Sequence, residues 1–189
     1  MLAMTKFAHK AFNGITYTFD HLHARELSVE LKPPSGAVEA KVQVLFGCHC
    51  FTEEFDDSCH GDQHRYTHRG ELRAFDLQRY ACSLQLPALV DAMIQGKVYR
   101  SAQSYTYVTQ IQLPPAVGQH SYSLFFSLEK EPASTIQAPR ATMFIKSAYM
   151  RDLAAPKNAP NWRYSALLGI NTGVYVPVSK PRPTKKSHG

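Results

Sequence analysis

The sequence contains no long apolar run, and no stretch approaches the roughly 18 residues that a membrane-spanning helix needs. The first residues, MLAMTKFAHKAF, lack the apolar core of a secretory signal, so we expect a cytoplasmic protein. Only four cysteines occur among 189 residues, and in that compartment we expect reduced thiols. These absences argue against a membrane partner and against a fold held together by disulfides.

The sequence also lacks the best-known catalytic signatures. It contains no G-x-S-x-G, no Walker A sequence, no G-x-G-x-x-G and no H-E-x-x-H. The sequence therefore gives no support to an interpretation as a serine hydrolase, a nucleotide-binding enzyme or a zinc protease. Hydrophobic residues make up 44% and aromatic residues 11% of the chain, which is enough for a core. We expect one strand-rich globular domain over residues 1–175.

Alternation of apolar and polar residues dominates the chain and predicts β-strands. The turn signal at 114–118 lies between two such segments and predicts a hairpin. We therefore expect an α+β fold built mainly on an antiparallel sheet. The predicted strands cover residues 15–19, 26–31, 41–46, 72–75, 105–113, 120–128, 140–149 and 164–170.

Only one stretch has helical spacing. Leu77, Tyr80 and Leu84 recur at intervals of three and four residues after Asp76, which is suited to an N-cap. Pro87 interrupts this pattern. We expect a broken helical insert at about residues 77–95, made of two short helices.

Positive charge is concentrated near one end of the sequence. The net charge is +6, and residues 140–189 contain nine Lys or Arg against one Asp or Glu. A one-sided basic segment is typical of proteins that bind nucleic acids. We expect residues 176–189, which are rich in proline and basic residues, to be a flexible tail. The candidate phosphate-binding residues are Arg140, Lys146, Lys157 and Arg163.

Residues 48–68 contain three of the four cysteines and four of the nine histidines. Cys48 and Cys50 lie two residues apart at a predicted strand end, so both side chains are expected on one side. Thiolates and imidazoles are common zinc ligands, and a zinc site is one interpretation. The alternatives are a hard cation bound by the acidic residues of this segment, or a polar loop without metal. The predicted zinc ligands are Cys48, Cys50, Cys59 and one of His60, His64 or His68, of which we select His64.

Metal-free RNA cleavage needs a base for the 2′-hydroxyl, an acid for the leaving oxygen and cations for the phosphate charge. His49, at a predicted strand end, suits the role of base or acid. His21 and His23 are further candidates for proton transfer. The remaining candidate catalytic residues, for phosphate binding or proton donation, are Arg79, Tyr149 and Arg151.

Several motifs, spread over residues 15–172, resemble a family of small bacterial proteins labelled as heat-shock or stationary-phase growth adaptation proteins. They are Tyr17…Phe19-Asp20-His21-Leu22-His23, Val42…Phe46…His49-Cys50-Phe51-Thr52, Arg73…Phe75-Asp76…Arg79-Tyr80…Ser83…Leu86-Pro87 and Ser147-Ala148-Tyr149…Arg151-Asp152. The resemblance implies a bacterial or prophage setting and a role in stress or defence. The candidate site residues that match the pattern are His49, Cys50, Arg73, Arg79, Tyr149 and Arg151.

Two classes of function fit these observations. The first is a basic protein that binds nucleic acid, with RNA favoured, and acts as a small metal-independent nuclease. The second is a non-enzymatic module that docks a protein partner or serves as a phage accessory protein, with a structural zinc in residues 48–68.

Overall fold

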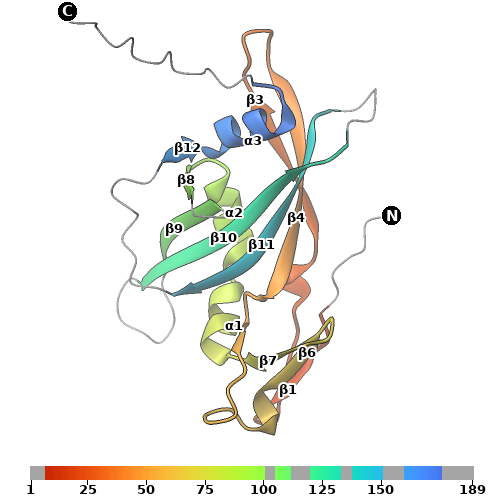
Figure 1. Cartoon of the computed structure of the whole chain (residues 1–189), viewed down its shortest axis with the longest axis vertical. Helices are drawn as coiled ribbons and strands as arrows, with labels where there is room; N and C mark the ends of the chain where they lie inside the picture. The colour runs from red at the N-terminus through yellow and green to blue at the C-terminus, as the bar shows by residue number, and fades with distance from the viewer. Residues whose placement is uncertain (1–6, 101–104, 112–119, 133–137, 151–159, 176–189) are drawn as a thin grey trace, which may run out of the picture.

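A computed structural model describes residues 7–100, 105–111, 120–132, 138–150 and 160–175 (Figure 1). A seven-stranded sheet, the large sheet, has the order β12-β8-β9-β10-β11-β4-β3. All its neighbouring strands are antiparallel except β11 and β4, which pair in parallel. Its strands are β3 (Arg25–Leu31), β4 (Val38–His49), β8 (Lys97–Arg100), β9 (Tyr105–Ile111), β10 (His120–Lys130), β11 (Arg140–Met150) and β12 (Asn161–Arg163).

A second, smaller sheet adjoins the end of β4, at the lower end of the molecule in Figure 1. This small sheet has the order β5-β7-β6 and is antiparallel throughout. Its strands are β5 (Thr52–Glu54), β6 (Arg65–His68) and β7 (Glu71–Phe75), and the 3₁₀ turn η2 (Asp62–His64) precedes β6. A separate hairpin pairs β1 (Lys10–Phe12) with β2 (Ile15–Tyr17), and the 3₁₀ turn η1 (Asp20–Leu22) follows it.

Two short helices cover one face of the large sheet, and β10 and β11 pass in front of α2 in Figure 1. The helix α1 (Leu77–Ser83) begins at Asp76, whose carboxylate accepts a hydrogen bond from the Arg79 backbone N–H at 2.6 Å. In α2 (Leu86–Met93), Pro87 occupies the first turn, where its missing N–H costs nothing. These helices confirm the predicted broken insert and, with the sheets, the α+β class.

Residues 164–170 were predicted as a strand, and this prediction is wrong. They belong to the helix α3 (Tyr164–Thr172), which buries Leu167 and Leu168 against the large sheet. The helix ends at Gly173, whose φ of 80° is the left-handed conformation favoured after a helix C-terminus. The secondary structure of this segment therefore follows the helical spacing of its apolar residues and not the local alternation.

None of the described helices has the length and apolar character that crossing a membrane requires. The proposed tail at residues 176–189 lies outside the described residues.

Candidate functional site

Two irregularities lie side by side where β4 meets β11. Along β4, the pairs Ile145–Phe46 and Ser147–His49 enclose one more residue than along β11. Along β11, Lys146 is the extra residue relative to β10. Because bulges interrupt the alternation of side chains, they redirect residues and are frequent next to active sites. The β4 bulge lets the consecutive residues Cys48 and His49 line the same pocket.

Gly47 allows the two strands to approach closely at this point. A Cβ atom at Gly47 would lie 2.8 Å from the backbone oxygen of Lys146 and 3.2 Å from Cζ of Phe144. The first contact is shorter than a side-chain carbon tolerates. The local sequence thus permits the geometry that exposes His49.

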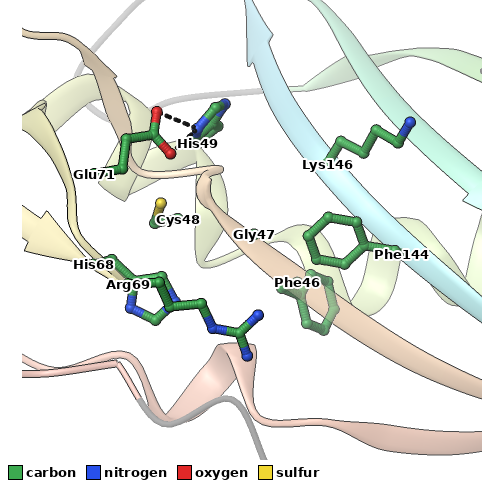
Figure 2. Close-up of a pocket in the computed structure, with 9 residues that line it drawn as sticks. All are labelled: Phe46, Gly47, Cys48, His49, His68, Arg69, Glu71, Phe144 and Lys146. Atoms are coloured by element: carbon green, nitrogen blue, oxygen red, sulfur yellow. Dashed lines mark hydrogen bonds and ion pairs between the residues drawn. The ribbon is translucent and has the colours of Figure 1, made fainter.

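His49 forms a pair with Glu71 across the two sheets (Figure 2). The His49 Nε2 lies 3.2 Å from Oε1 of Glu71 and 3.3 Å from Oε2. A carboxylate accepts only, so this contact assigns the proton to Nε2 and leaves Nδ1 as an acceptor. The His49 side chain is 38% exposed, so Nδ1 belongs to a ring that solutes can reach.

Glu71 is placed by a tight hairpin between β6 and β7. The turn residues Arg69 and Gly70 have φ of 52° and 82°, and His68 pairs with Glu71 across the turn. Two consecutive residues with positive φ are the signature of the favoured two-residue hairpin turn. This hairpin brings Glu71 against the end of β4, a contact that the sequence analysis missed.

The environment of Glu71 keeps its carboxyl group ionised. Its partial burial acts to raise its pKa, but the hydrogen bonds and charges of His49 and Arg73 outweigh this effect and lower the pKa. Arg73 donates from Nη1 to Oε1 of Glu71 at 3.1 Å. The result is a charged carboxylate that orients the imidazole of His49.

A pocket of about 400 Å³ opens beside this pair. Its walls are mostly apolar, and two basic residues line it, Lys146 from β11 and Arg69 from the turn between β6 and β7 (Figure 2). The pocket combines an oriented imidazole with two cations, which suits an anionic ligand that has an apolar part. The lining residues are Phe46, Gly47, Cys48, His49, His68, Arg69, Glu71, Phe144 and Lys146.

The two predicted catalytic residues Arg79 and Tyr149 lie next to each other. The guanidinium carbon of Arg79 is 5.1 Å from the ring centroid of Tyr149, a cation–π contact. Arg79 also donates from Nη1 to the Thr52 carbonyl at 2.9 Å, and its Nη2 lies 3.8 Å from Glu53. Arg79 is therefore held by protein groups and does not line the pocket that His49 lines. Arg151 lies outside the described residues.

Thr52 connects both arginines to the end of β4. Its hydroxyl donates to the Cys48 carbonyl at 2.8 Å and accepts from Nε of Arg73 at 3.2 Å. With the Arg79 contact to its carbonyl, Thr52 thus joins two of the motif-bearing segments, residues 42–52 and 73–87, in one partly buried network.

The four predicted zinc ligands occupy four different environments. The Cys50 thiol is fully buried and donates to the Ile145 carbonyl at 3.8 Å, and burial raises its pKa to about 12. The Cys59 side chain is exposed, and its thiol donates a hydrogen bond to the Asp56 carbonyl. His64 contacts the backbone of Gly61. Cys48 and Cys50 are both buried, but Cys50 follows β4 in a turn and does not line the pocket that Cys48 lines.

Cys48 joins a different group of potential ligands. Within the described part of the chain, one group of three such residues is present, Cys48, His49 and Glu71, and their ligand atoms all lie within 4.8 Å of one another. Burial, and then the charge of Glu71, raises the pKa of the Cys48 thiol.

The predicted phosphate-binding residues are not gathered in one place. Arg140 forms ion pairs with Glu26 at 2.7 Å and with Glu131 at 3.1 Å. Arg163 lies in β12 at the far edge of the large sheet, and Lys157 lies outside the described residues. Of the three that the structure describes, only Lys146 lines the pocket beside His49.

The further histidine candidates have structural partners. His21 lies 2.8 Å from the Ser83 hydroxyl, which itself donates to the Tyr80 carbonyl and is fully buried. His23 contacts Asp20 at 3.5 Å. A buried hydroxyl committed to a helix carbonyl is not a nucleophile that substrate can reach, so this pair is not a catalytic dyad.

The fold and this pocket define a strand-rich α+β protein with a histidine–carboxylate pair at the junction of two sheets. The chain belongs to the YjaZ family, whose family model matches residues 7–169. The match covers every residue of the pocket. Neither a curated protein nor a solved structure matches the chain.

Proposed function

We propose that this protein binds RNA in the cytoplasm and cleaves it without a metal ion, with His49 as the proton-transfer residue. The observation that carries the proposal is the His49–Glu71 pair at 3.2 Å, on a pocket that Lys146 and Arg69 also line. An oriented imidazole whose other ring nitrogen can accept a proton supports a role for His49 as a general base. The two basic side chains supply the charge that a phosphodiester requires.

The proposed reaction uses the 2′-hydroxyl of RNA as the nucleophile. Nδ1 of His49 accepts the 2′-hydroxyl proton, and the bond between O2′ and phosphorus forms as the bond to O5′ breaks. The departing 5′ oxygen takes a proton from water, and the products are a 2′,3′-cyclic phosphate and a 5′-hydroxyl. Glu71 stabilises the imidazolium, and Lys146 and Arg69 stabilise the charge on the phosphate.

The roles of the other predicted residues follow from their contacts. Arg79 supports the Tyr149 ring and the Thr52 carbonyl, so we assign it a positioning role. Arg140 is neutralised by two carboxylates and contributes little to phosphate binding in this proposal. A role in stress or defence in a bacterial or prophage setting, implied by the resemblance, is part of the same proposal.

RNA cleavage by His49→Ala against wild type tests this function. We expect a rate lower by a factor of about 10² to 10⁴, with RNA binding retained. His64→Ala is the matched control, because His64 lies in a surface turn outside the pocket. A DNA oligonucleotide of the same sequence should bind without being cut. Full activity of His49→Ala, or no turnover by wild type on any RNA, would overturn the proposal.

A non-enzymatic interaction module is the second candidate, and one observation favours it. A surface hollow of about 760 Å³ is lined by the acidic residues Glu53, Glu54, Asp56 and Asp57. Such a surface suits a basic peptide of a protein partner or of a phage assembly. For this interaction module, we propose that a structural zinc ion stabilises residues 48–68, the segment that begins at the end of β4. Absence of turnover, together with a melting temperature that falls on chelation, would favour this candidate over the nuclease.

A further inference from the structure

Three side chains of different chemistry converge at the end of β4. The Cys48 sulfur, a His49 ring nitrogen and a Glu71 carboxylate oxygen lie within 4.8 Å of one another, and the sulfur points toward the carboxylate in Figure 2. We propose that these three residues bind one divalent transition-metal ion, of the zinc class, with a fourth coordination position open to the pocket. The site has different ligands from the predicted one, since it uses Glu71 and excludes Cys50, Cys59 and His64.

The donor set selects the class of ion. A thiolate, an imidazole and one carboxylate suit Zn²⁺ and its substitute Co²⁺, whereas Mg²⁺ and Ca²⁺ take oxygen ligands. The two negative charges of the thiolate and the carboxylate balance a dication. Neutrality of the loaded site removes the main electrostatic cost of holding an ion in a half-buried position.

The spacing of the ligands is close to that of a loaded site. Bond lengths of about 2.0–2.3 Å place tetrahedral ligand atoms roughly 3.3–3.7 Å apart. No separation here exceeds 4.8 Å, so the longest of them must shorten by up to about 1.5 Å. Side-chain rotation can supply this movement, because Glu71 is 52% and His49 38% exposed. Cys48 is the fixed member, since it is buried at the bulge.

The residues around the triad already orient two of its members. Arg73 donates to Oε1 of Glu71 at 3.1 Å and leaves the other oxygen available to an ion. The Thr52 hydroxyl anchors the Cys48 carbonyl at 2.8 Å, which fixes the backbone that carries the sulfur. Partners of this kind, which hold the ligands in position, are typical of metal sites in proteins.

Three protein ligands leave one tetrahedral position for water or a substrate atom, as in catalytic zinc sites. The pocket of about 400 Å³ lies beside that position, and Arg69 and Lys146 line it. An anion that reaches the ion therefore meets two cationic side chains. We infer an exchangeable ion in an open site, in contrast to a closed structural zinc.

Metal binding and the proposed RNA cleavage make opposite use of His49. An ion on Nε2 forces the neutral ring to carry its proton on Nδ1, so the base is lost. The metal site does not depend on the nuclease proposal, and it can be tested without RNA.

The test is a titration of metal-free, reduced full-length protein with Co²⁺, followed by absorption spectroscopy and equilibrium dialysis. We expect one Co²⁺ per chain, a thiolate-to-cobalt charge-transfer band, the intense visible bands of tetrahedral cobalt, and displacement by Zn²⁺. Cys48→Ser should abolish the charge-transfer band. Cys59→Ser is the matched control and should leave it unchanged, because Cys59 is exposed and lies outside the triad.

Glu71→Gln keeps the test independent of any folding defect caused by changing the buried Cys48. It should weaken Co²⁺ binding at least about tenfold and leave the charge-transfer band in the bound form, since the thiolate is retained. Circular dichroism of each variant checks the fold. No saturable binding by wild type would overturn the proposal, as would a band lost in Cys59→Ser and kept in Cys48→Ser. RNA cleavage by the metal-free protein, measured separately, reports on the nuclease proposal alone.

Discussion

The large and the small sheet are stabilised by different kinds of side chain. The core between β4, β11 and the helices is mainly aliphatic, with residues such as Val42, Met143 and Leu124 fully buried. The small sheet and the β1–β2 hairpin enclose a cluster of aromatic rings. That aromatic cluster comprises Phe7, Phe12, Tyr17, Phe19, Phe51, Tyr66, Phe75 and Tyr80.

Strand length explains this difference. The strands β10, β11 and β4 have 11 or 12 residues, so many small apolar groups meet along them. The strands of the small sheet have three to five residues and present few inward positions. Large rings bury about 150–250 Å² each, so a few of them suffice for a short sheet. The candidate site lies at the boundary, with His49 from one sheet and Glu71 from the other.

The largest expected effect comes from removing the central ring of the aromatic cluster. Phe51 stacks on Phe19 at 4.0 Å and meets Phe7 and Tyr66 edge to face. Phe51→Ala should lower the free energy of unfolding by about 3–5 kcal/mol in urea denaturation. Leu124→Ala, in the aliphatic core, should cost about 2–5 kcal/mol. In Phe51→Ala, hydrogen exchange should increase most in β5–β7. An equal increase in both sheets would contradict the view that the two cores are stabilised separately.

Gly47→Ala tests how closely β4 must approach β11 at the boundary. The added methyl group would meet the Lys146 backbone oxygen, which cannot move independently of the strand. We expect a loss of about 1–3 kcal/mol in unfolding free energy. Gly61→Ala is the control, because its nearest neighbour is the mobile end of the Gln63 side chain. Equal stability of the two variants would show that the strands can separate without cost.

Asp76→Ala tests the connection between the small sheet and the helices. The Asp76 side chain caps α1, while its backbone N–H donates to the Phe51 carbonyl at 3.2 Å. Loss of an N-cap costs about 1 kcal/mol, within a range of about 0.5–2 kcal/mol, so thermal unfolding should shift to lower temperature. Asp76→Asn retains a capping oxygen and should therefore keep most of the stability that Asp76→Ala loses. If Asp76→Asn is as unstable as Asp76→Ala, the stabilisation comes from the charge of Asp76 and not from the capping hydrogen bond.

The smallest effect is a pH dependence of stability at the seam between η1 and α1. Burial lowers the pKa of His21 below 6.5, against the opposing charge of Asp20. The unfolded chain then binds the proton more tightly than the folded protein does. This contribution to stability is complete above about pH 6.5 and decreases as the pH falls from there toward the folded pKa. His21→Gln should flatten the dependence in urea titrations between pH 7.5 and 5.5, and an unchanged slope would contradict the assignment.

Much of the fold could be predicted because its signals are local. The sequence pattern identified strands corresponding to β2, β3, β4, β7, β9, β10 and β11, and Asp76 marked the start of α1. The error at residues 164–170 arose because a short apolar segment fits both the two-residue repeat of a strand and the 3.6-residue repeat of a helix. The Asn13-Gly14 turn was a missed hairpin signal, with φ of 48° and 76°.

The site was only partly predictable. His49 was expected at a strand end and is found there, because strand position follows from sequence periodicity. Glu71 carries no comparable signal, since its contact with His49 depends on how the β6–β7 hairpin packs against β4. The bulge that includes Cys48 arises from the register between β4 and β11, which are almost 100 residues apart in the chain.

The parallel pairing of β4 with β11 has a consequence for the protein during its synthesis. His49 meets its cross-strand neighbour Ser147 only after the ribosome has released nearly the whole intervening chain. Contacts between such distant segments form late, because closing the long loop costs entropy before any pairing repays it. An unfinished polypeptide therefore carries His49, Glu71 and the complete small sheet, but no second wall for the pocket. Whatever the pocket does, the nascent chain cannot do it until β11 has been synthesised and has paired with β4.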